Sequence, residues 1–526
     1  MFPTCPRLLL FTLALLPVTS VAQTPSAAKA ATRSCTVDHT EPTSGERALA
    51  SRNYGAALTF YQAALAADPT SDEAHLGLVR ALAGQDKTAD ALADAASNLT
   101  QHPSSALAEV ASAEAAYRKA DFESMRLHAI SALKLNPCEA RAVAVEARFF
   151  TLIAHFATAA RLLAQAHQLR PGDELIRRAW INSLPPSHRL DEISQYLANA
   201  KTISDNDRRL LTLEQTHLTA SHPGECRIVS NPGSTKIPFI PIFGDNMHPV
   251  AYGLEVAFDG KKRRMEIDSG ASGITLSPEA AKRLGLTPEL HGRIGGIGDE
   301  GAVGSFTTHV ASIQIGNVQL ADCMVEVLQK SRLDIDGLIG PDVFGRWLAT
   351  LDFPDRELDL KPLPPLPPSP TNDDETLPHD AIVPPHMEDW LHFARIGHNI
   401  LIPTSVNNGP IHYMIVDTGA ADTIFSLRYA KEAGKVGSDE DREFKGLSGK
   451  VAQNYTTGMV RMQFGNFAIP PYSYPAFNID NASHGTGVEV SGFIGLPTLS
   501  LLAITIDYRD NLMQLKYDRY HTGLPH

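Results

Sequence analysis

The sequence predicts a multidomain protein in which an all-α solenoid of helical repeats precedes two all-β lobes. Three observations support this fold class. Four prolines recur at one spacing in the first half, the alanine-rich composition stops near Ser221, and the rest of the chain contains one succession of motifs twice. A chain of 526 residues is also longer than a domain with a single hydrophobic core usually is, so several domains are expected.

The N-terminal residues have the pattern of a secretory signal peptide. Arg7 precedes an apolar run over residues 8–18, and a small-x-small site ends at Ala22. The run is too short to span a bilayer, so we expect a signal peptide over residues 1–22, with an uncleaved anchor as the alternative. No later segment is apolar enough to be transmembrane. The mature protein is therefore expected to be exported and soluble.

Charge and cysteine content restrict the possible partners. The formal net charge of -13 argues against a nucleic-acid partner, because phosphate contacts need clustered Lys and Arg. Four cysteines follow the expected cleavage site, and none has the spacing of metal ligands. Disulfides and free thiols both stay open, and four cysteines allow three full pairings. These cysteines are Cys35, Cys138, Cys226 and Cys323.

A period of 34 residues organises the first half of the chain. Apolar and small residues before each repeated proline recur at steps of three and four, which places them on one helical face. Small alanines allow close helix packing, and a proline ends each helix. The prolines are Pro69, Pro103, Pro137 and Pro171.

This pattern resembles the tetratricopeptide repeat (TPR) over residues 44–215. The resemblance implies antiparallel helix pairs stacked into a solenoid, whose concave face usually holds a peptide or a partner protein. An unrelated helical bundle is the alternative. The sequence does not identify the partner, and a structural role for the solenoid is equally open.

Two segments rich in Pro and Gly divide the chain. Residues 222–244 are expected to be a linker, and the following YGLEVAF, DGKK and RRMEI predict a β-hairpin. Residues 363–385 form a second, Pro-rich linker, which is expected to be an extended spacer. Its length would allow the units on either side to lie next to each other.

The units on either side of the second linker are two copies of one β-rich domain. Asp268 and Asp417 are 149 residues apart, and each is followed by strand-like and then helical sequence. Further on, Gly340 and Gly495 are 155 residues apart, and two strand-turn-strand segments repeat the offset. Lobe 1 is assigned to residues 236–362 and lobe 2 to residues 386–520.

Each copy contains an acid, a hydroxyl residue and a glycine at the end of an apolar strand, in MEIDSGASG and MIVDTGAAD. Two carboxylates held about 3 Å apart cannot both ionise easily, so one pKa rises and the pair shares a proton. One member then acts as a base on water and the other as an acid. The titration belongs to the pair, so neither role is assigned to Asp268 or Asp417 alone.

At these residues the chain resembles the retropepsin-like and pepsin-like aspartic proteases. The resemblance implies catalytic Asp268 and Asp417, a substrate cleft between two β-barrel-like lobes, a peptide or protein substrate, no metal or other cofactor, and sensitivity to statine-type inhibitors. It is carried by the loops Asp268-Ser269-Gly270-Ala271 and Asp417-Thr418-Gly419-Ala420, and by Leu338-Ile339-Gly340 and Phe493-Ile494-Gly495.

The residues around the acids are expected to support the site. The hydroxyls of Ser269 and Thr418 can hydrogen-bond across the pair, and Gly270 and Gly419 allow close approach of the backbone. Asp342 is expected to cap the short helix after Leu-Ile-Gly-Pro. Both copies contain a flap-like glycine loop, as in a dimeric retropepsin, whereas pepsin-like enzymes rely on one. The flap candidates are Gly295, Gly296, Gly298, Gly446 and Gly449.

The sequence therefore predicts an exported aspartic endopeptidase, a hydrolase with a helical-repeat arm for a partner or substrate. The domain combination indicates a bacterial protein, so a periplasmic or secreted location is expected. Two alternatives remain. The lobes could bind a peptide without cutting it, or they could be active only by pairing between chains.

Overall fold

The computed structural model describes residues 35–199, 203, 205–219, 226–230, 233–244, 249–330, 333, 335–367, 378–439 and 442–517. The predicted signal peptide and part of the second linker lie outside these residues. Within the described ranges, no helix has the length and apolar character needed to cross a membrane.

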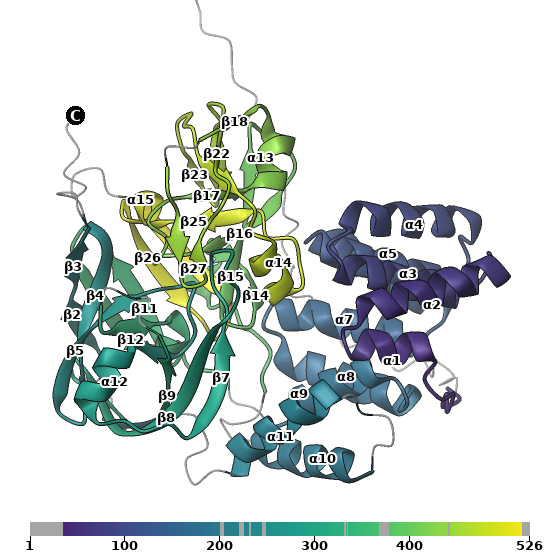
Figure 1. Ribbon diagram of the computed structural model, residues 1–526, viewed down its shortest axis with the longest axis horizontal. Coiled ribbons are helices and arrows are strands. Elements are labelled where there is room, and N and C mark those ends of the chain that lie inside the picture. Colours follow the sequence, from purple (N-terminus) through teal and green to yellow (C-terminus); the bar gives the residue numbers. More distant parts are fainter. Residues whose placement is uncertain are drawn as a thin grey trace, which may run out of the picture. The chain divides into compact units, whose positions relative to one another are not determined.

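The first half of the described chain is a stack of helix pairs (Figure 1). Consecutive helices pack against each other, and α1, α3, α5 and α7 also pack one against the next. The helices are α1 (Ser44–Ala50), α2 (Tyr54–Ala67), α3 (Asp72–Gly84), α4 (Thr88–Gln101), α5 (Ala106–Arg118), α6 (Phe122–Leu135), α7 (Ala140–Leu152), α8 (Phe156–Leu169), α9 (Glu174–Asn182), α10 (Pro186–Asn199) and α11 (Asp205–Thr219).

The 34-residue period of the sequence recurs in the backbone. A non-glycine residue in the left-handed region precedes α2, α4, α6 and α8, where the chain turns from one helix into its partner. Asn53 and Asp121 then cap α2 and α6 with their side chains. The left-handed residues are Arg52, Asp86, Ala120 and Ala154.

Lobe 1 is built on a nine-stranded sheet, in the order β1-β9-β6-β10-β5-β4-β8-β7 with β3 paired to β4. Its elements are β1 (Arg227–Ser230), β2 (Thr235–Pro238), β3 (Ile240–Phe243), β4 (Pro249–Phe258), β5 (Lys261–Ile267), β6 (Ile274–Leu276), α12 (Pro278–Leu284), β7 (Leu290–Ile294), β8 (Val303–Ile315), β9 (Val318–Leu328), β10 (Gly337–Ile339), η1 (Pro341–Phe344), β11 (Trp347–Asp352) and β12 (Glu357–Pro362).

The expectation that residues 222–244 form only a linker is wrong, because this segment contributes β1, β2 and β3. Of these, β1 pairs with β9 and β2 with β12, both far along the chain, so local composition could not reveal these two strands. The third strand, β3, pairs with the neighbouring β4. Cys226, next to β1, forms a disulfide with Cys323 in β9. For this pair, the choice between a disulfide and free thiols is settled.

Lobe 2 repeats the arrangement in a ten-stranded sheet, in the order β18-β21-β24-β17-β25-β16-β15-β22-β23 with β14 paired to β15. Its elements are η2 (Pro385–Met387), β13 (Leu391–His392), β14 (Ala394–Ile396), β15 (Asn399–Val406), β16 (His412–Val416), β17 (Ile424–Ser426), α13 (Leu427–Ala433), β18 (Val436–Ser438), β19 (Lys445–Gly446), β20 (Gly449–Lys450), β21 (Tyr455–Thr457), β22 (Met462–Phe464), β23 (Phe467–Ala468), β24 (Pro475–Phe477), α14 (Asp480–Thr486), β25 (Gly492–Ile494), α15 (Leu496–Leu499), β26 (Leu502–Asp507) and β27 (Leu512–Tyr517).

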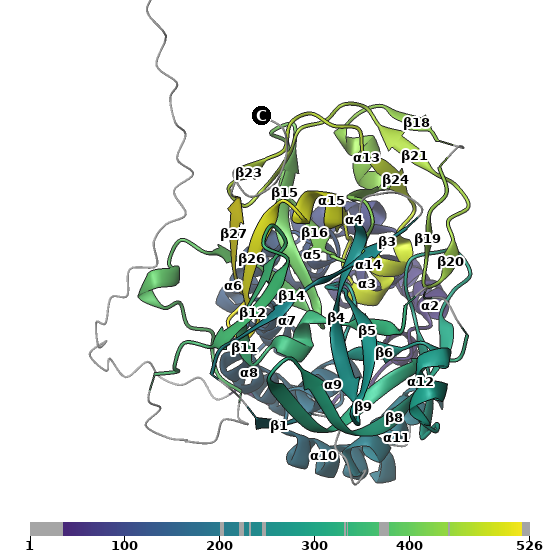
Figure 2. The ribbon, with the colours of Figure 1, turned by 90° about the vertical axis from the view of Figure 1, so that its left-hand side faces the viewer.

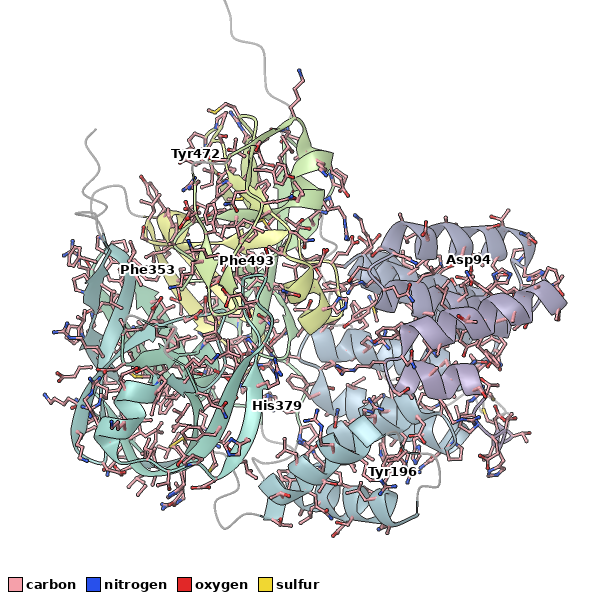
Figure 3. The ribbon with its side chains drawn as sticks, viewed as in Figure 1. Asp94, Tyr196, Phe353, His379, Tyr472 and Phe493 are labelled. Atoms are coloured by element: carbon pink, nitrogen blue, oxygen red, sulfur yellow. A yellow bond between two sulfur atoms is a disulfide. The ribbon has the colours of Figure 1, made fainter. Side chains whose placement is uncertain are left out.

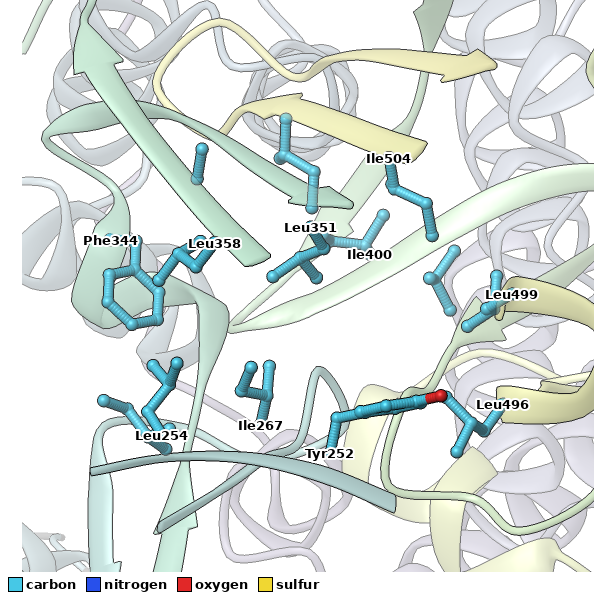
Figure 4. Packing of buried hydrophobic residues seen from close by; sticks show 14 of the residues in the cluster. Tyr252, Leu254, Ile267, Phe344, Leu351, Leu358, Ile400, Leu496, Leu499 and Ile504 are labelled. Atoms are coloured by element: carbon cyan, nitrogen blue, oxygen red, sulfur yellow. The ribbon is translucent and has the colours of Figure 1, made fainter. Parts of the chain in front are cut away.

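A six-stranded sheet joins the lobes, in the order β13-β27-β26-β11-β12-β2 (Figure 2). Its centre is the antiparallel pair β11 and β26, where Thr350 lies opposite Thr505 and their hydroxyl oxygens are 2.9 Å apart. These residues are 155 positions apart, the offset of the duplicated motifs, so equivalent residues meet at the pseudo-twofold axis. Buried residues of both lobes also form one apolar cluster, which includes Ile267 and Ile400 (Figure 4).

The second linker and lobe 2 also contact the solenoid. Asp380, at the end of the second linker, accepts hydrogen bonds from the amide and the hydroxyl of Thr158 at 2.8 and 2.7 Å. It thereby caps α8, which has no cap of its own. The ring of Phe122 on α6 lies 4.7 Å from that of Tyr413, between centroids. One apolar cluster contains residues of α5, α6 and α7 together with Phe493 of β25. Figure 3 labels Phe493 in lobe 2.

Candidate active site

The two acids stand at the ends of equivalent strands. Asp268 follows β5 and donates its amide to the carbonyl of Ile339 at 3.0 Å. Asp417 follows β16 and donates its amide to Ile494, also at 3.0 Å. In both lobes the acid-bearing strand therefore runs parallel to the strand of the later glycine motif, β10 or β25. The same backbone arrangement positions both acids.

Ser269 and Thr418 lock the two loops together by reciprocal hydrogen bonds. The amide of Ser269 donates to the Thr418 hydroxyl at 3.0 Å, and the amide of Thr418 donates to the Ser269 hydroxyl at 2.9 Å. Each hydroxyl then donates across to the other lobe, Ser269 to the carbonyl of Val416 and Thr418 to that of Ile267. Both side chains are only 1% exposed, so these groups have no water to replace a lost partner.

Gly270 and Gly419 let the loops approach until the carboxyl groups meet. A Cβ atom on Gly270 would lie 2.9 Å from Cγ of Asp417, and one on Gly419 would lie 2.6 Å from Cγ of Asp268. Any side chain at either position would push a carboxyl group away. The glycines also hold these groups, because their amides donate to the adjacent carboxylates at 2.8 and 3.0 Å.

The side chains of Asp268 and Asp417 are hydrogen-bonded to each other. Burial raises the pKa of both carboxyl groups. For Asp417 the charge of Asp268 raises the pKa further, well above its usual value, while hydrogen bonds from Gly270 and Asp417 oppose the rise at Asp268. Such a pair retains one proton to higher pH than a free carboxyl would, so it offers an acid and a base side by side.

His398 is a neighbour of the pair that the sequence did not reveal. Its Nε2 lies 3.0 Å from the carbonyl oxygen of Gly270, although it belongs to the other lobe. Its charge also lowers the pKa of Asp268. Tyr508 fixes the backbone here by donating its hydroxyl to the carbonyl of His398 at 2.9 Å. His398 is 128 residues from Gly270 in the sequence, and no motif around it indicates this contact.

Asp342 does not cap the short helix as predicted. Its carboxylate accepts the amide of Gly273 at 2.9 and 3.0 Å, and η1 has no side-chain cap. It therefore supports the loop that follows Asp268. The error arose because the helix is adjacent in sequence, whereas the loop is adjacent only in the fold.

The predicted flap glycines lie in two loops that contact each other. Ser448 lies between β19 and β20, and its hydroxyl accepts a hydrogen bond from the amide of Gly296 at 3.1 Å. The amide of Ser448 donates to the carbonyl of Ile297 at 2.8 Å. Gly298 approaches Ser448 so closely that a Cβ atom would be 2.4 Å from its carbonyl carbon. The side chain of Asn481 donates to the carbonyl of Gly298 at 3.1 Å. Gly295 belongs to the first loop, and Gly446 and Gly449 end β19 and begin β20.

Comparisons with known proteins found similar sequences for parts of the chain. Residues 254–346 match the family model described as gag-polyprotein putative aspartyl protease, and residues 48–96 match that of the tetratricopeptide repeat. The UBA domain-containing protein Mud1 of Schizosaccharomyces pombe is 30% identical over 113 residues, which are 20% of this chain and 33% of that protein. The chain thus spans about a third of the length of this curated relative.

Three solved structures are similar to parts of the chain. The aspartic proteinase from Irpex lacteus has a TM-score of 0.35 and 11% identity, over 55% of this chain and 99% of that one. A retropepsin-like aspartic protease from Rickettsia conorii has a TM-score of 0.19 and 20% identity, over 26% and 92%. A thermophilic TPR protein from Thermus thermophilus has a TM-score of 0.26 and 22% identity, over 33% and 94%.

The family models and the strand arrangement together confirm the predicted fold class. The chain combines TPR-like repeats with aspartic protease-like lobes. Among the described residues, no three His, Cys, Asp or Glu side chains are grouped so that they could hold a metal ion.

The reciprocal hydroxyl contacts predict a specific stability effect. In Thr418→Val the amide of Ser269 loses its acceptor in a buried place, so unfolding should become easier by about 1–3 kcal/mol. Thr418→Ser keeps the hydroxyl and is the matched control. Urea unfolding followed by the fluorescence of Trp347 and Trp390, which are buried in the lobes, measures the difference. Equal midpoints for the valine and serine variants would contradict the role given to the hydroxyl.

Proposed function

We propose that the chain is an aspartic endopeptidase in which Asp268 and Asp417 activate a water molecule against a peptide bond. The observation that carries the proposal is the hydrogen-bonded pair of carboxyl groups, supplied by two lobes of one chain. The matches to an aspartyl protease family model and the two contacting flap loops support it.

The mechanism follows from one proton shared by two carboxyl groups. The ionised member takes a proton from water, whose oxygen then bonds to the carbonyl carbon of the peptide. The protonated member gives its proton to the carbonyl oxygen, so that a neutral tetrahedral diol forms and the pair again holds one proton. Transfer of a proton to the amide nitrogen breaks the carbon–nitrogen bond and releases an amine and a carboxylic acid. The hydrogen-bonded glycine loops keep both carboxyl groups in place throughout.

Pairing within one chain favours this proposal over activity that needs two chains. The contacts of Ser269 with Thr418, and the shared sheet of β11 and β26, are made inside a single molecule. The binding-only alternative needs no proton on the pair. The fold is the same in the binding-only alternative and in the peptidase proposal, so only the chemistry of the two acids distinguishes them.

Substitution of the acids tests the proposal directly. Asp268→Asn and Asp417→Asn should each abolish cleavage of unfolded protein substrates, while Asp355→Asn, at an exposed acid in the β11–β12 turn, should not. Wild-type activity should be present at acidic pH and fall as pH rises through the raised pKa of Asp417, because the pair then loses its shared proton. Cleavage by either asparagine variant at the wild-type rate would exclude this catalytic assignment.

We further propose that the TPR-like region binds the protein substrate or a partner protein. A pocket of about 340 Å³ is lined by Arg80, Glu114, Arg148 and the exposed Leu175 on α9, among other residues of this region, and also by His484 and Gly487 of lobe 2. Paired charges beside apolar side chains suit a polypeptide segment, whose backbone needs donors and acceptors.

Two leucine variants test this binding role. Leu175→Arg should raise KM for an unfolded protein substrate much more than for a short peptide, because only the longer chain reaches the pocket. Leu127→Arg, at an exposed leucine of α6 outside the pocket, is the matched control. Equal effects of Leu175→Arg on both substrates, or none on the protein, would argue against the proposal.

We also propose that the protein is exported to the periplasm or secreted. The N-terminal sequence and the disulfide between Cys226 and Cys323 support this, because disulfides persist in oxidising compartments. Residues 1–30 fused to a reporter that is active only outside the cytoplasm should give activity. Arg substitutions within residues 8–18 should remove it. A reporter that stays inactive with the natural sequence would refute export.

A further inference from the structure

Glu266 occupies a position beside the carboxyl pair that the proposed mechanism does not use. It lies in β5, two residues before Asp268, while Met265 and Ile267 on either side of it are buried in the core at 0% and 3% exposure. Side chains alternate along a strand, so Glu266 lies on the same face as Asp268. Two steps along a strand separate their Cα atoms by about 6.6 Å.

The carboxyl group of Glu266 has no partner among the described residues. Within the described part of the chain it forms no hydrogen bond or ion pair, and its neighbours across the sheet are Gly253 of β4 and Leu338 of β10. The residue is half-buried, and its oxygens are not sealed from solvent. Burial, together with the nearby charge of Asp268, raises the pKa of Glu266 to about 8. An unpaired, half-buried acid is costly unless a ligand supplies its partner.

The second lobe differs at this position. Ile415 is the counterpart of Glu266, again two residues before the acid, and its neighbours are Leu401 of β15 and Phe493 of β25. All three are buried and apolar, at 2%, 0% and 5% exposure. The two halves of the site therefore present different chemistry beside the same acid pair, with a carboxyl group in lobe 1 only.

We propose that Glu266 selects substrates with a lysine or arginine side chain next to the cleaved bond, on the lobe 1 side. This inference rests on the proposed peptidase activity and specifies its substrate class. A cationic side chain is long enough to cover the distance between a peptide held at Asp268 and the carboxyl group two residues back. The bound cation favours the ionised form of Glu266, so binding releases the proton that the empty site retains. Leu338, the neighbour of Glu266 in β10, offers an apolar surface for the methylene stem.

Peptides that differ at one position test the selectivity. Lysine, norleucine or glutamate is placed in turn on each side of the cleaved bond, and kcat/KM is measured at one pH. On one side of the bond, kcat/KM of the wild type should be at least tenfold higher for the lysine peptide than for the norleucine peptide. Glu266→Gln should reduce that ratio at least tenfold. Glu255→Gln, at an exposed glutamate of β4, should leave the ratio unchanged. Glu266→Lys should shift the preference to glutamate.

A binding measurement separates this inference from the peptidase proposal. The same peptides with a reduced, uncleavable bond are titrated into wild type and Glu266→Gln. One outcome is that no peptide is cleaved, but the wild type still binds the lysine peptide more tightly than the norleucine peptide and Glu266→Gln does not. In that case the peptidase proposal fails and the role of Glu266 stands. If the peptides are cleaved and the ratio of lysine to norleucine is near one, or is the same in Glu266→Gln, the role of Glu266 is overturned.

Discussion

The site depends on the reciprocal hydrogen bonds between Ser269 and Thr418. Each hydroxyl accepts from one amide of the other lobe and donates to one carbonyl of it, so four hydrogen bonds cross the pseudo-twofold axis in a nearly solvent-free place. Two carboxyl groups that repel each other would move apart without such a constraint. The energy that holds them together is supplied by neighbouring neutral groups, and the raised pKa of Asp417 is a consequence.

The shared six-stranded sheet makes that constraint possible. The register of β11 on β26 places Thr350 opposite its equivalent Thr505, so the axis of the duplication is fixed by backbone pairing far from the acids. Each lobe then needs only to deliver its own loop to a predetermined place. The continuous apolar cluster of the two lobes adds rigidity, because a shift of one lobe against the other would disturb packing in both (Figure 4).

The sequence revealed those features whose causes are local or repeated. The period of 34 residues marks turns that recur in the backbone, and the two Asp-hydroxyl-Gly motifs mark loops whose contacts obey the same symmetry. His398, the true role of Asp342 and the strands β1 and β2 were missed because each acts through a partner distant in sequence. Glu266 was visible in MEIDSGASG, but only the folded sheet shows that its carboxyl group has no partner within the described ranges.

Duplication gives two equal halves of a site, and the solenoid makes them unequal. Residues of α5, α6 and α7 share one apolar cluster with Ile415 and Phe493, so the strand face beside Asp417 belongs to a packed interior. A charged residue there would have to be buried without a partner, at a large cost. The corresponding face of lobe 1 carries Glu266, and its neighbours belong to lobe 1 itself. A substitution at this position in lobe 1 can therefore change the selectivity for the substrate. At the equivalent position in lobe 2, packing requires an apolar residue.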